Sequence, residues 1–270
     1  MARKGRSKEQ IEAAPAPDPR WLDLLNSAEP LKGVPGPGRW LVIRYQPTSL
    51  FSLKTSQATS SVGVTLVIPT PYAIKMAFVD AAFRTGYEDV ECAKFLRSLV
   101  KVDVRVAPAR IAVVTNTFQK VRQEPKKKDR LRPYISSIAY RELVYFDGTW
   151  LWAFDLAGCD YTTAEMLVRL GPHVNYVGKR GSFVQFLKNF RLVGLDARFT
   201  QPMPVDLLQI LPPKVHVRLL DDFGPEARLE VLSSFTTAQA KADKHRKFVE
   251  TIIPTAITNI GPGFSEYSAE

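Results

Sequence analysis

Hydrophobic and polar residues alternate along several short segments of this chain, and such alternation is typical of β-strands with one buried face. The first segment is 39–45 (RWLVIRY), where we expect ordered structure to begin. A longer strand-like run covers 102–121 and is interrupted at Pro108, and residues 134–145 are rich in β-branched and aromatic types. Large apolar residues then recur at every second position over 150–156. The pattern predicts strands spread along most of the chain.

Three helices are predicted between these strands. Thr70 followed by Pro71 is typical of an N-cap and a first helical residue, and the apolar residues that follow fall on one helical face. A second helix is expected over 89–100. The spacing of Thr162 and Glu165 is that of a capping box and predicts the start of the third helix.

The last third of the chain has a weaker pattern. Residues 214–220 and 227–232 are expected to pair as a hairpin around 221–226, and a helix is expected around 237–250. Beyond these elements the segment is polar and contains several prolines.

Composition divides the chain into three parts. Residues 1–38 contain many prolines and glycines and are expected to form a flexible N-terminal extension, in which only Trp21–Leu25 (WLDLL) suits docking as a short helix. Residues 39–200 are expected to form the main domain. Residues 201–270 are expected to form a C-terminal hairpin and tail that pack on that domain.

The order of strands and helices predicts an α+β fold of the ferredoxin-like (RRM-like) type. In such a fold an antiparallel sheet carries helices on one face, and the other face is free for a ligand. A fold of this kind hosts many functions, so it does not specify one.

Composition then narrows the class of protein. The chain has 270 residues, of which 45% are apolar, so it can bury a sizeable core. Its net charge of +10 and pI near 9.6 suit a polyanionic partner. Its two cysteines form neither a zinc motif nor a disulfide framework, and no apolar run is long enough to span a membrane. We expect a soluble cytoplasmic protein with no membrane partner, metal or cofactor.

Positive charge concentrates in 119–132 (QKVRQEPKKKDRLR), which lies between two strand-like runs. Residues 101–132 contain ten Lys or Arg and three Asp or Glu, which gives +7 of the net charge. A basic hairpin of this kind suits contact with a phosphate backbone. The alternative is a solvated loop without a partner.

A second basic loop is 178–182 (GKRGS). Its glycines allow backbone N–H groups to approach a phosphate, and Ser182 adds a hydroxyl. It is not a Walker motif, because Arg180 follows Lys179 and His173 occupies the place of the first required glycine. The alternative is a plain turn.

Arg44 and Tyr45 end the first strand, where a ferredoxin-like sheet presents stacking and phosphate-binding groups. The alternative is an edge pair that covers the core. Together, the residues expected to bind RNA are Arg44, Tyr45, Lys54, Lys75, Lys120, Arg122, Lys126, Lys127, Lys128, Arg130, Arg132, Gly178, Lys179, Arg180 and Ser182.

The case for catalysis is weaker than the case for binding. The chain has three histidines, of which His173 is the best candidate for acid–base work, while His216 lies in a strand pattern and His245 among basic residues. Signatures of a serine or cysteine nucleophile are absent, and so is metal-ligand spacing. We therefore predict no catalytic residue and no enzymatic activity.

The segment 68–78 (IPTPYAIKMAF) resembles the entry into the first helix of Cas protein family five, the subunit that caps the 5′ end of the guide RNA in type I CRISPR Cascade complexes. Three further features agree: the RWLVIRY strand, the basic hairpin in the position of the family's thumb, and NYVGKRGSFVQF at 175–186. The resemblance covers roughly 39–198.

The resemblance implies a RAMP domain that holds the 5′ handle of the crRNA and caps the backbone filament, in antiviral defence or other RNA-guided DNA targeting. The thumb corresponds to about 118–134 and would bury apolar residues, including Ile135 and Ile138, against a neighbouring backbone RAMP subunit. The Cascade large subunit would dock nearby, and target DNA would be contacted only indirectly.

One branch of the family instead cleaves precursor crRNA with a Tyr/Lys/His set that includes a histidine near the thumb. Tyr45 suits the tyrosine, but no histidine precedes His173 here. We therefore expect a separate endonuclease. Two alternatives stay open: a metal-independent endoribonuclease that uses His173 or Tyr45, and a general RNA- or ssDNA-binding module without CRISPR partners.

Overall fold

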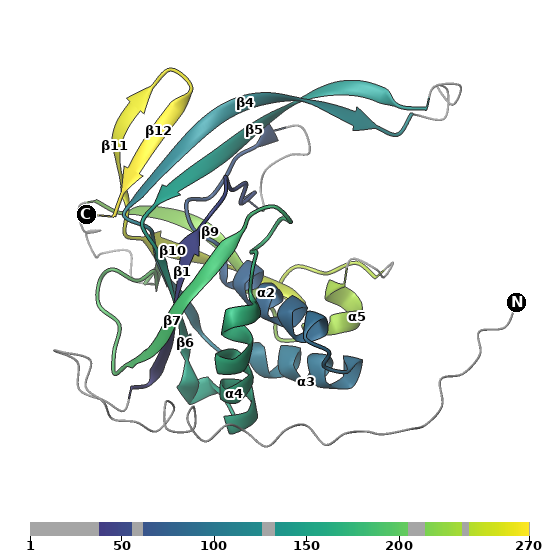
Figure 1. Cartoon of the computed structure of the whole chain (residues 1–270), viewed down its shortest axis with the longest axis vertical. Helices are drawn as coiled ribbons and strands as arrows, with labels where there is room; N and C mark the ends of the chain where they lie inside the picture. The colour runs from purple at the N-terminus through teal and green to yellow at the C-terminus, as the bar shows by residue number, and fades with distance from the viewer. Residues whose placement is uncertain (1–37, 56–61, 126–132, 205–213, 234–237, 270) are drawn as a thin grey trace, which may run out of the picture.

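In the computed structural model of the chain, a four-stranded antiparallel sheet carries three helices on one face (Figure 1). This mixed α/β architecture confirms the prediction of helices packed on an antiparallel sheet. No helix in the part of the chain that is described is both long and apolar enough to cross a membrane. The structure describes residues 38–55, 62–125, 133–204, 214–233 and 238–269.

The central sheet has the strand order β3-β6-β1-β7. Large side chains at every second position of β1 face the helices and join those of β6 in the core, as the period-two pattern predicted. The strands are β1 (Trp40–Pro47), β3 (Val104–Ala107), β6 (Trp150–Asp155) and β7 (Val184–Leu192).

The three helices are α2 (Pro71–Arg84), α3 (Asp89–Leu99) and α4 (Tyr161–Leu170). Thr70 is the N-cap of α2, as predicted, and its hydroxyl accepts a hydrogen bond from the Ala73 amide at 3.2 Å.

The predicted start of α4 was wrong by two residues. Asp160, not Thr162, is its N-cap, because the Asp160 carboxylate accepts from the Thr163 amide at 2.7 Å. Asp and Thr are both good N-caps, so the local sequence offered two starts. Short 3-10 turns, η2 (Leu156–Gly158) and η3 (Gly171–His173), flank the helix.

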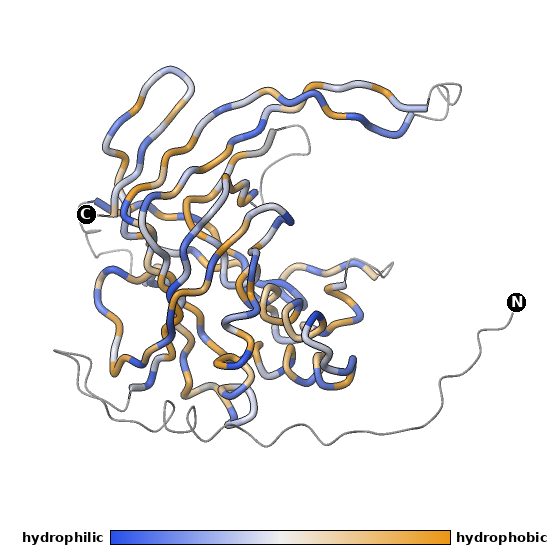
Figure 2. Tube along the Cα trace, viewed as in Figure 1, coloured by the Kyte–Doolittle hydropathy of each residue, from blue (hydrophilic) through white to orange (hydrophobic). Residues whose placement is uncertain are grey.

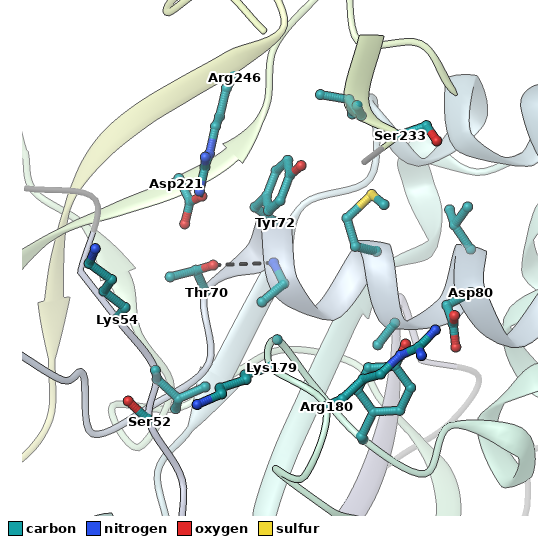
Figure 3. Close-up of a pocket in the computed structure, with 18 of the residues that line it drawn as sticks. Ser52, Lys54, Thr70, Tyr72, Asp80, Lys179, Arg180, Asp221, Ser233 and Arg246 are labelled. Carbon is teal, nitrogen blue, oxygen red and sulfur yellow. Dashed lines mark hydrogen bonds and ion pairs between the residues drawn. The ribbon is translucent and has the colours of Figure 1, made fainter. Parts of the chain in front are cut away.

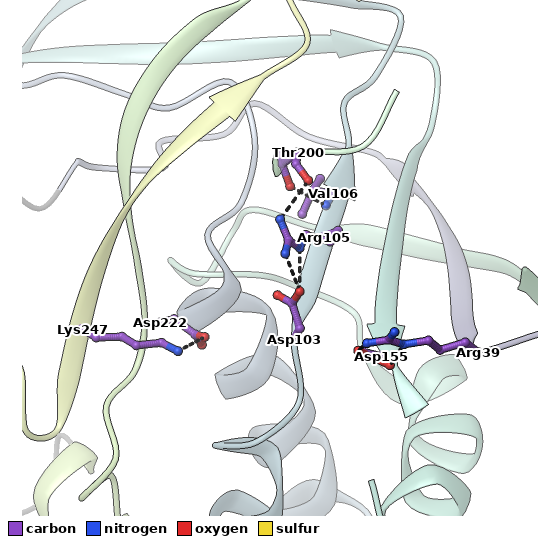
Figure 4. A network of polar contacts seen from close by, with 8 residues as sticks. All are labelled: Arg39, Asp103, Arg105, Val106, Asp155, Thr200, Asp222 and Lys247. Carbon is purple, nitrogen blue, oxygen red and sulfur yellow. Dashed lines mark hydrogen bonds and ion pairs between the residues drawn. The ribbon is translucent and has the colours of Figure 1, made fainter. Parts of the chain in front are cut away.

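The face of the central sheet opposite the helices is not wholly free, which corrects the sequence prediction. Phe199 is buried there in a small cluster with Val42 and Ala153. Thr200 fixes this segment, because its hydroxyl accepts from the Val106 amide and its carbonyl from Arg105, which also pairs with Asp103 (Figure 4).

The predicted basic hairpin is present and is longer than 118–134. Its strands are β4 (Ile111–Gln123) and β5 (Ile135–Asp147), which pair along their whole length and extend beyond the body of the protein (Figure 1). We call this hairpin the arm. A short strand, β2 (Val62–Gly63), pairs with β5 in parallel.

The C-terminal predictions were wrong in their pairing. The strand β9 (His216–Phe223) pairs with β10 (Arg246–Ile253), while Leu229–Leu232 forms the short helix α5. The expected helix around 237–250 is absent because its second half belongs to β10. The short strand β8 (Gln201–Pro202) completes this sheet on the other side of β10.

The last strands, β11 (Ala256–Gly261) and β12 (Phe264–Ser268), form a hairpin with Gly263 at φ +83° in its turn. β12 pairs with the first residues of β4, so the chain's C-terminal hairpin widens the base of the arm into a five-stranded sheet, β11-β12-β4-β5-β2.

Candidate nucleic-acid interface

A groove of about 1200 Å³ lies between α2, the glycine loop 178–182 and the C-terminal segment (Figure 3). Five cationic residues from separate parts of the chain line it, together with three acidic ones. Two of the acidic residues are paired, Asp80 with Arg84 and Asp221 with Arg246. The cationic residues of the lining are Lys54, Arg141, Lys179, Arg180 and Arg246.

The N-terminus of α2 opens onto this groove, since Thr70 and Tyr72 both line it. A 14-residue helix presents a partial positive charge at its N-terminus, which favours anions there. The cationic side chains of the groove therefore lie near a helix N-terminus that also carries a partial positive charge.

The glycine loop has the conformation that glycine permits. Gly178 has φ +72° and Gly181 has φ +100°, values that other residues rarely adopt. The Ser182 amide donates to the Lys179 carbonyl at 3.0 Å, which closes a turn with Lys179 and Arg180 at its exposed corner. Ser182 itself is 2% exposed, so its hydroxyl is not presented at the surface of the loop in this structure.

Two further predicted contact residues are in the core. Tyr45 is fully buried: its hydroxyl donates to the Gly171 carbonyl at 2.8 Å, and its ring lies 4.2 Å from that of Trp152. Burial raises the pKa of Tyr45 well above its ordinary value. Lys75 is also fully buried, with its Nζ 2.7 Å from Asp222 Oδ1. Neither side chain is accessible to RNA in this structure.

Arg44 lies on the face of β1 opposite to Tyr45, between Leu151 and Lys188 of the neighbouring strands. It is half-buried and does not line the groove. The structure therefore separates it from Lys54, Lys179 and Arg180, which the groove brings together.

The arm carries cationic, aromatic and aliphatic side chains, and Figure 2 shows that hydrophilic and hydrophobic residues are mixed along both of its strands. Lys120 and Arg122 are exposed on the same face of β4 as Phe118, which is 75% exposed. The Phe118 ring lies 5.3 Å from that of Tyr140, and Arg122 lies over Tyr134 at 4.5 Å. The remaining predicted cations of the tip lie outside the described residues: Lys126, Lys127, Lys128, Arg130 and Arg132.

The apolar residues of the arm do not share one face. Ile138 lies opposite Lys120 and is 71% exposed, whereas Ile135 lies opposite Gln123 on the other face and is half-buried. The two isoleucines therefore cannot be buried together by one flat contact.

Among the groove residues that sequence reasoning missed are the aromatic Tyr72 and the two cations Arg141 and Arg246. Tyr72 follows the predicted N-cap directly, so the helix start was a signal for it. Arg141 lies in β5, and the sequence pattern did not predict how this strand lies relative to the groove. Arg246 belongs to a segment that was predicted as helix, so no local signal placed it here.

The histidines and cysteines of the chain lie in different environments. His173 is exposed and its carbonyl accepts from Arg84, whereas burial lowers the pKa of His216. Burial raises the pKa of Cys92 to about 11 and that of Cys159 to about 12, so neither thiolate is populated near neutral pH. Across the ranges that the structure describes, no three His, Cys, Asp or Glu side chains cluster as metal ligands would.

Comparison with known proteins gives one curated relative, and no protein-family model matches the chain. The relative is the CRISPR-associated protein Cas5 of Archaeoglobus fulgidus, which is 22% identical over 147 residues. The match covers 54% of this chain and 62% of the relative, so the chain spans about three fifths of the relative's length.

Solved structures are also similar to this chain. One is a CRISPR protein from Archaeoglobus fulgidus, with a TM-score of 0.38 and 11% identity over 86% of this chain and 92% of that one. Another comes from a CRISPR RNA-guided surveillance complex, with a TM-score of 0.43 and 12% identity over 79% of this chain and 89% of that one. The resemblance to Cas protein family five that the sequence indicated is confirmed by the curated relative.

Proposed function

We propose that this protein is a crRNA-binding subunit of a type I CRISPR Cascade complex, which holds the 5′ handle of the crRNA and caps the backbone filament. The observation that carries the proposal is the convergence of Lys54, Lys179 and Arg180 on the groove at the N-terminus of α2. The similarity to a Cas5 protein supports the same function.

The topology supports the assignment of a ferredoxin-like RAMP domain. In chain order the four strands of the central sheet are β1, β3, β6 and β7, and their spatial order is fourth, first, third, second, with every neighbouring pair antiparallel. Helices connect the first strand to the second and the third to the fourth. This is the βαββαβ arrangement of the ferredoxin-like fold.

In this proposal the groove and the arm bind the RNA in different ways. The groove lysines, the loop amides and the start of α2 hold phosphates, which makes the affinity dependent on salt. The arm offers exposed aromatic and cationic side chains that suit splayed bases and their backbone. Backbone subunits and the large subunit are proposed neighbours, and target DNA is reached through them.

The proposed role is not catalytic, so a separate endonuclease supplies the mature crRNA. Incubation of the purified chain with repeat RNA in EDTA tests this directly. Specific cleavage that His173→Ala abolishes would instead identify a metal-independent endoribonuclease.

The binding proposal is tested by expressing the chain with its genomic neighbours and a CRISPR array, then isolating the complex through a tag on another subunit. We expect the chain to co-purify with uniform short RNAs that begin with repeat sequence. The combined change Lys54→Ala, Lys179→Ala and Arg180→Ala should lower the RNA content by about tenfold or more.

A matched control removes three charges from outside the groove, by Lys94→Ala, Arg97→Ala and Lys101→Ala on and just after α3, where all three side chains are exposed. This control should retain RNA. Equal RNA content in the two variants, or RNA without repeat-derived 5′ ends, would overturn the proposal. A general RNA-binding module would be recognised by binding RNA without any co-purifying RAMP subunits.

A further inference from the structure

Arg246 of β10 lies over the ring of Tyr72, the second residue of α2. Its Cζ is 4.4 Å from the centre of the Tyr72 ring, and Phe223 meets the same ring edge-on at 5.5 Å. Both Tyr72 and Arg246 line the groove, where Figure 3 shows them side by side. A stacked pair from two distant segments therefore forms part of the groove wall.

Asp221 holds the guanidinium in this position. Its Oδ2 accepts from Arg246 Nε at 2.6 Å and also pairs with Nη2, and Asp221 itself is buried. The charge of Arg246 is thus largely compensated, yet its side chain remains 39% exposed. Arg246 offers the groove a fixed planar surface rather than a mobile positive charge.

Planar guanidinium and aromatic groups are the surfaces on which unstacked nucleobases lie in single-stranded RNA complexes. Lys54 and Lys179 line the same groove and suit the phosphates on either side of such a base. The groove therefore combines a stacking surface with phosphate-binding charges.

We propose that one unpaired nucleobase of a single-stranded RNA stacks on the Tyr72–Arg246 pair. The inference rests on the proposed function. It adds a contact with an unpaired base to the proposed contacts with the phosphate backbone. Stacking of this kind tolerates all four bases, because every base has a π-face and Asp221 already uses the hydrogen-bonding edge of the guanidinium.

The test uses the full chain and a fluorescent eight-nucleotide single-stranded RNA, with affinity measured over a range of salt concentrations. Tyr72→Leu and Arg246→Lys should each weaken binding by about tenfold without changing the salt slope. Tyr72→Phe keeps the ring and should bind as the wild type does. The control Arg218→Lys, at an exposed position of β9 outside the groove, should also have no effect.

A crosslinking measurement on the wild-type chain does not depend on whether the variants fold. RNA that carries 5-iodouridine, irradiated on the wild-type chain, should crosslink to the peptide that contains Tyr72. Crosslinks confined to other peptides, or wild-type affinity in Tyr72→Leu, would overturn the stacking inference and leave the proposed function intact. Failure of the wild-type chain to bind any RNA, alone or within its complex, would overturn both.

Discussion

Lys75 and Asp222 form a buried ion pair that joins α2 to β9 of the three-stranded sheet β8-β10-β9. Lys75 Nζ lies 2.7 Å from Asp222 Oδ1, and the two side chains are 0% and 11% exposed. Burial lowers the pKa of Lys75, and the charge of Asp222 opposes that shift. Lys247 of β10 reaches the other carboxylate oxygen at 3.5 Å (Figure 4). The pair thus joins α2 to the strands β9 and β10, which contribute Asp221 and Arg246 to the groove.

Lys75→Ala should destabilise the protein strongly. It leaves the Asp222 carboxylate without its buried cation, with only the partly exposed Lys247 and the Phe223 amide as partners. The loss of one member of a buried pair costs about 3 kcal/mol in the free energy of unfolding. Chemical denaturation measures this value. The control Arg198→Ala breaks an exposed ion pair with Asp196 and should change stability by less than about 1 kcal/mol. Similar losses in the two variants would contradict the structural role of Lys75.

Tyr45→Phe should affect stability and not RNA binding. It removes the buried hydrogen bond to the Gly171 carbonyl, which then keeps only the bond from the Val174 amide at 3.3 Å, at a cost of about 1 kcal/mol. RNA affinity measured below the melting temperature should stay unchanged. A large loss of RNA affinity in a folded Tyr45→Phe protein would instead indicate that Tyr45 belongs to the RNA-binding site.

His216 should make the protein less stable in mild acid. Its Nδ1 lies 3.1 Å from both oxygens of Thr255, its ring lies 5.6 Å from that of Tyr267, and Arg218 is its cationic neighbour. Burial, as the largest cause, lowers its pKa in the folded state below the ordinary value of 6.5. The unfolded chain therefore binds the proton first as the pH falls.

The stabilising contribution of neutral His216 is complete above pH 6.5 and is lost as the pH falls below that value toward the folded pKa. Denaturation curves between pH 7.5 and 5.5 measure this loss. His216→Gln should give a flatter dependence than the wild type. Identical slopes for the two proteins would rule out this contribution.

The exposed aromatic of the arm should matter for binding and little for folding. Phe118→Ser should change the free energy of unfolding by no more than about 0.5 kcal/mol, because the side chain is 75% exposed. It should weaken RNA binding several-fold through the loss of stacking. A matched change on the opposite face, Val121→Ser, should have the smaller effect on affinity. The reverse ranking would place the RNA on the other face of the arm.

The sequence predicted correctly those elements that are determined by residues close together in the chain. Thr70 and Pro71 define the start of α2, and the period-two run 150–156 defines a buried strand. The positive φ of Gly178 and Gly181 agrees with the glycine-flanked loop. The pairing of β9 with β10 was missed because it joins strands that are separated by a helix and an irregular segment, and no local pattern encodes such a register.

The candidate site was predicted in part for the same reason. Lys179 and Arg180 belong to a turn that the sequence makes visible. The burial of Lys75 was not predicted, because its partner Asp222 is far away in the sequence. The Tyr72–Arg246 stack joins residues too distant in the chain for any periodicity to relate them.

The most direct test of the account is a cryo-EM reconstruction of the complex that this chain forms with its genomic neighbours and a crRNA. The account predicts that the 5′ end of the RNA occupies the groove between α2 and the glycine loop, with Lys54 and Lys179 at its phosphates. RNA bound elsewhere, with the groove empty or filled by protein, would contradict it.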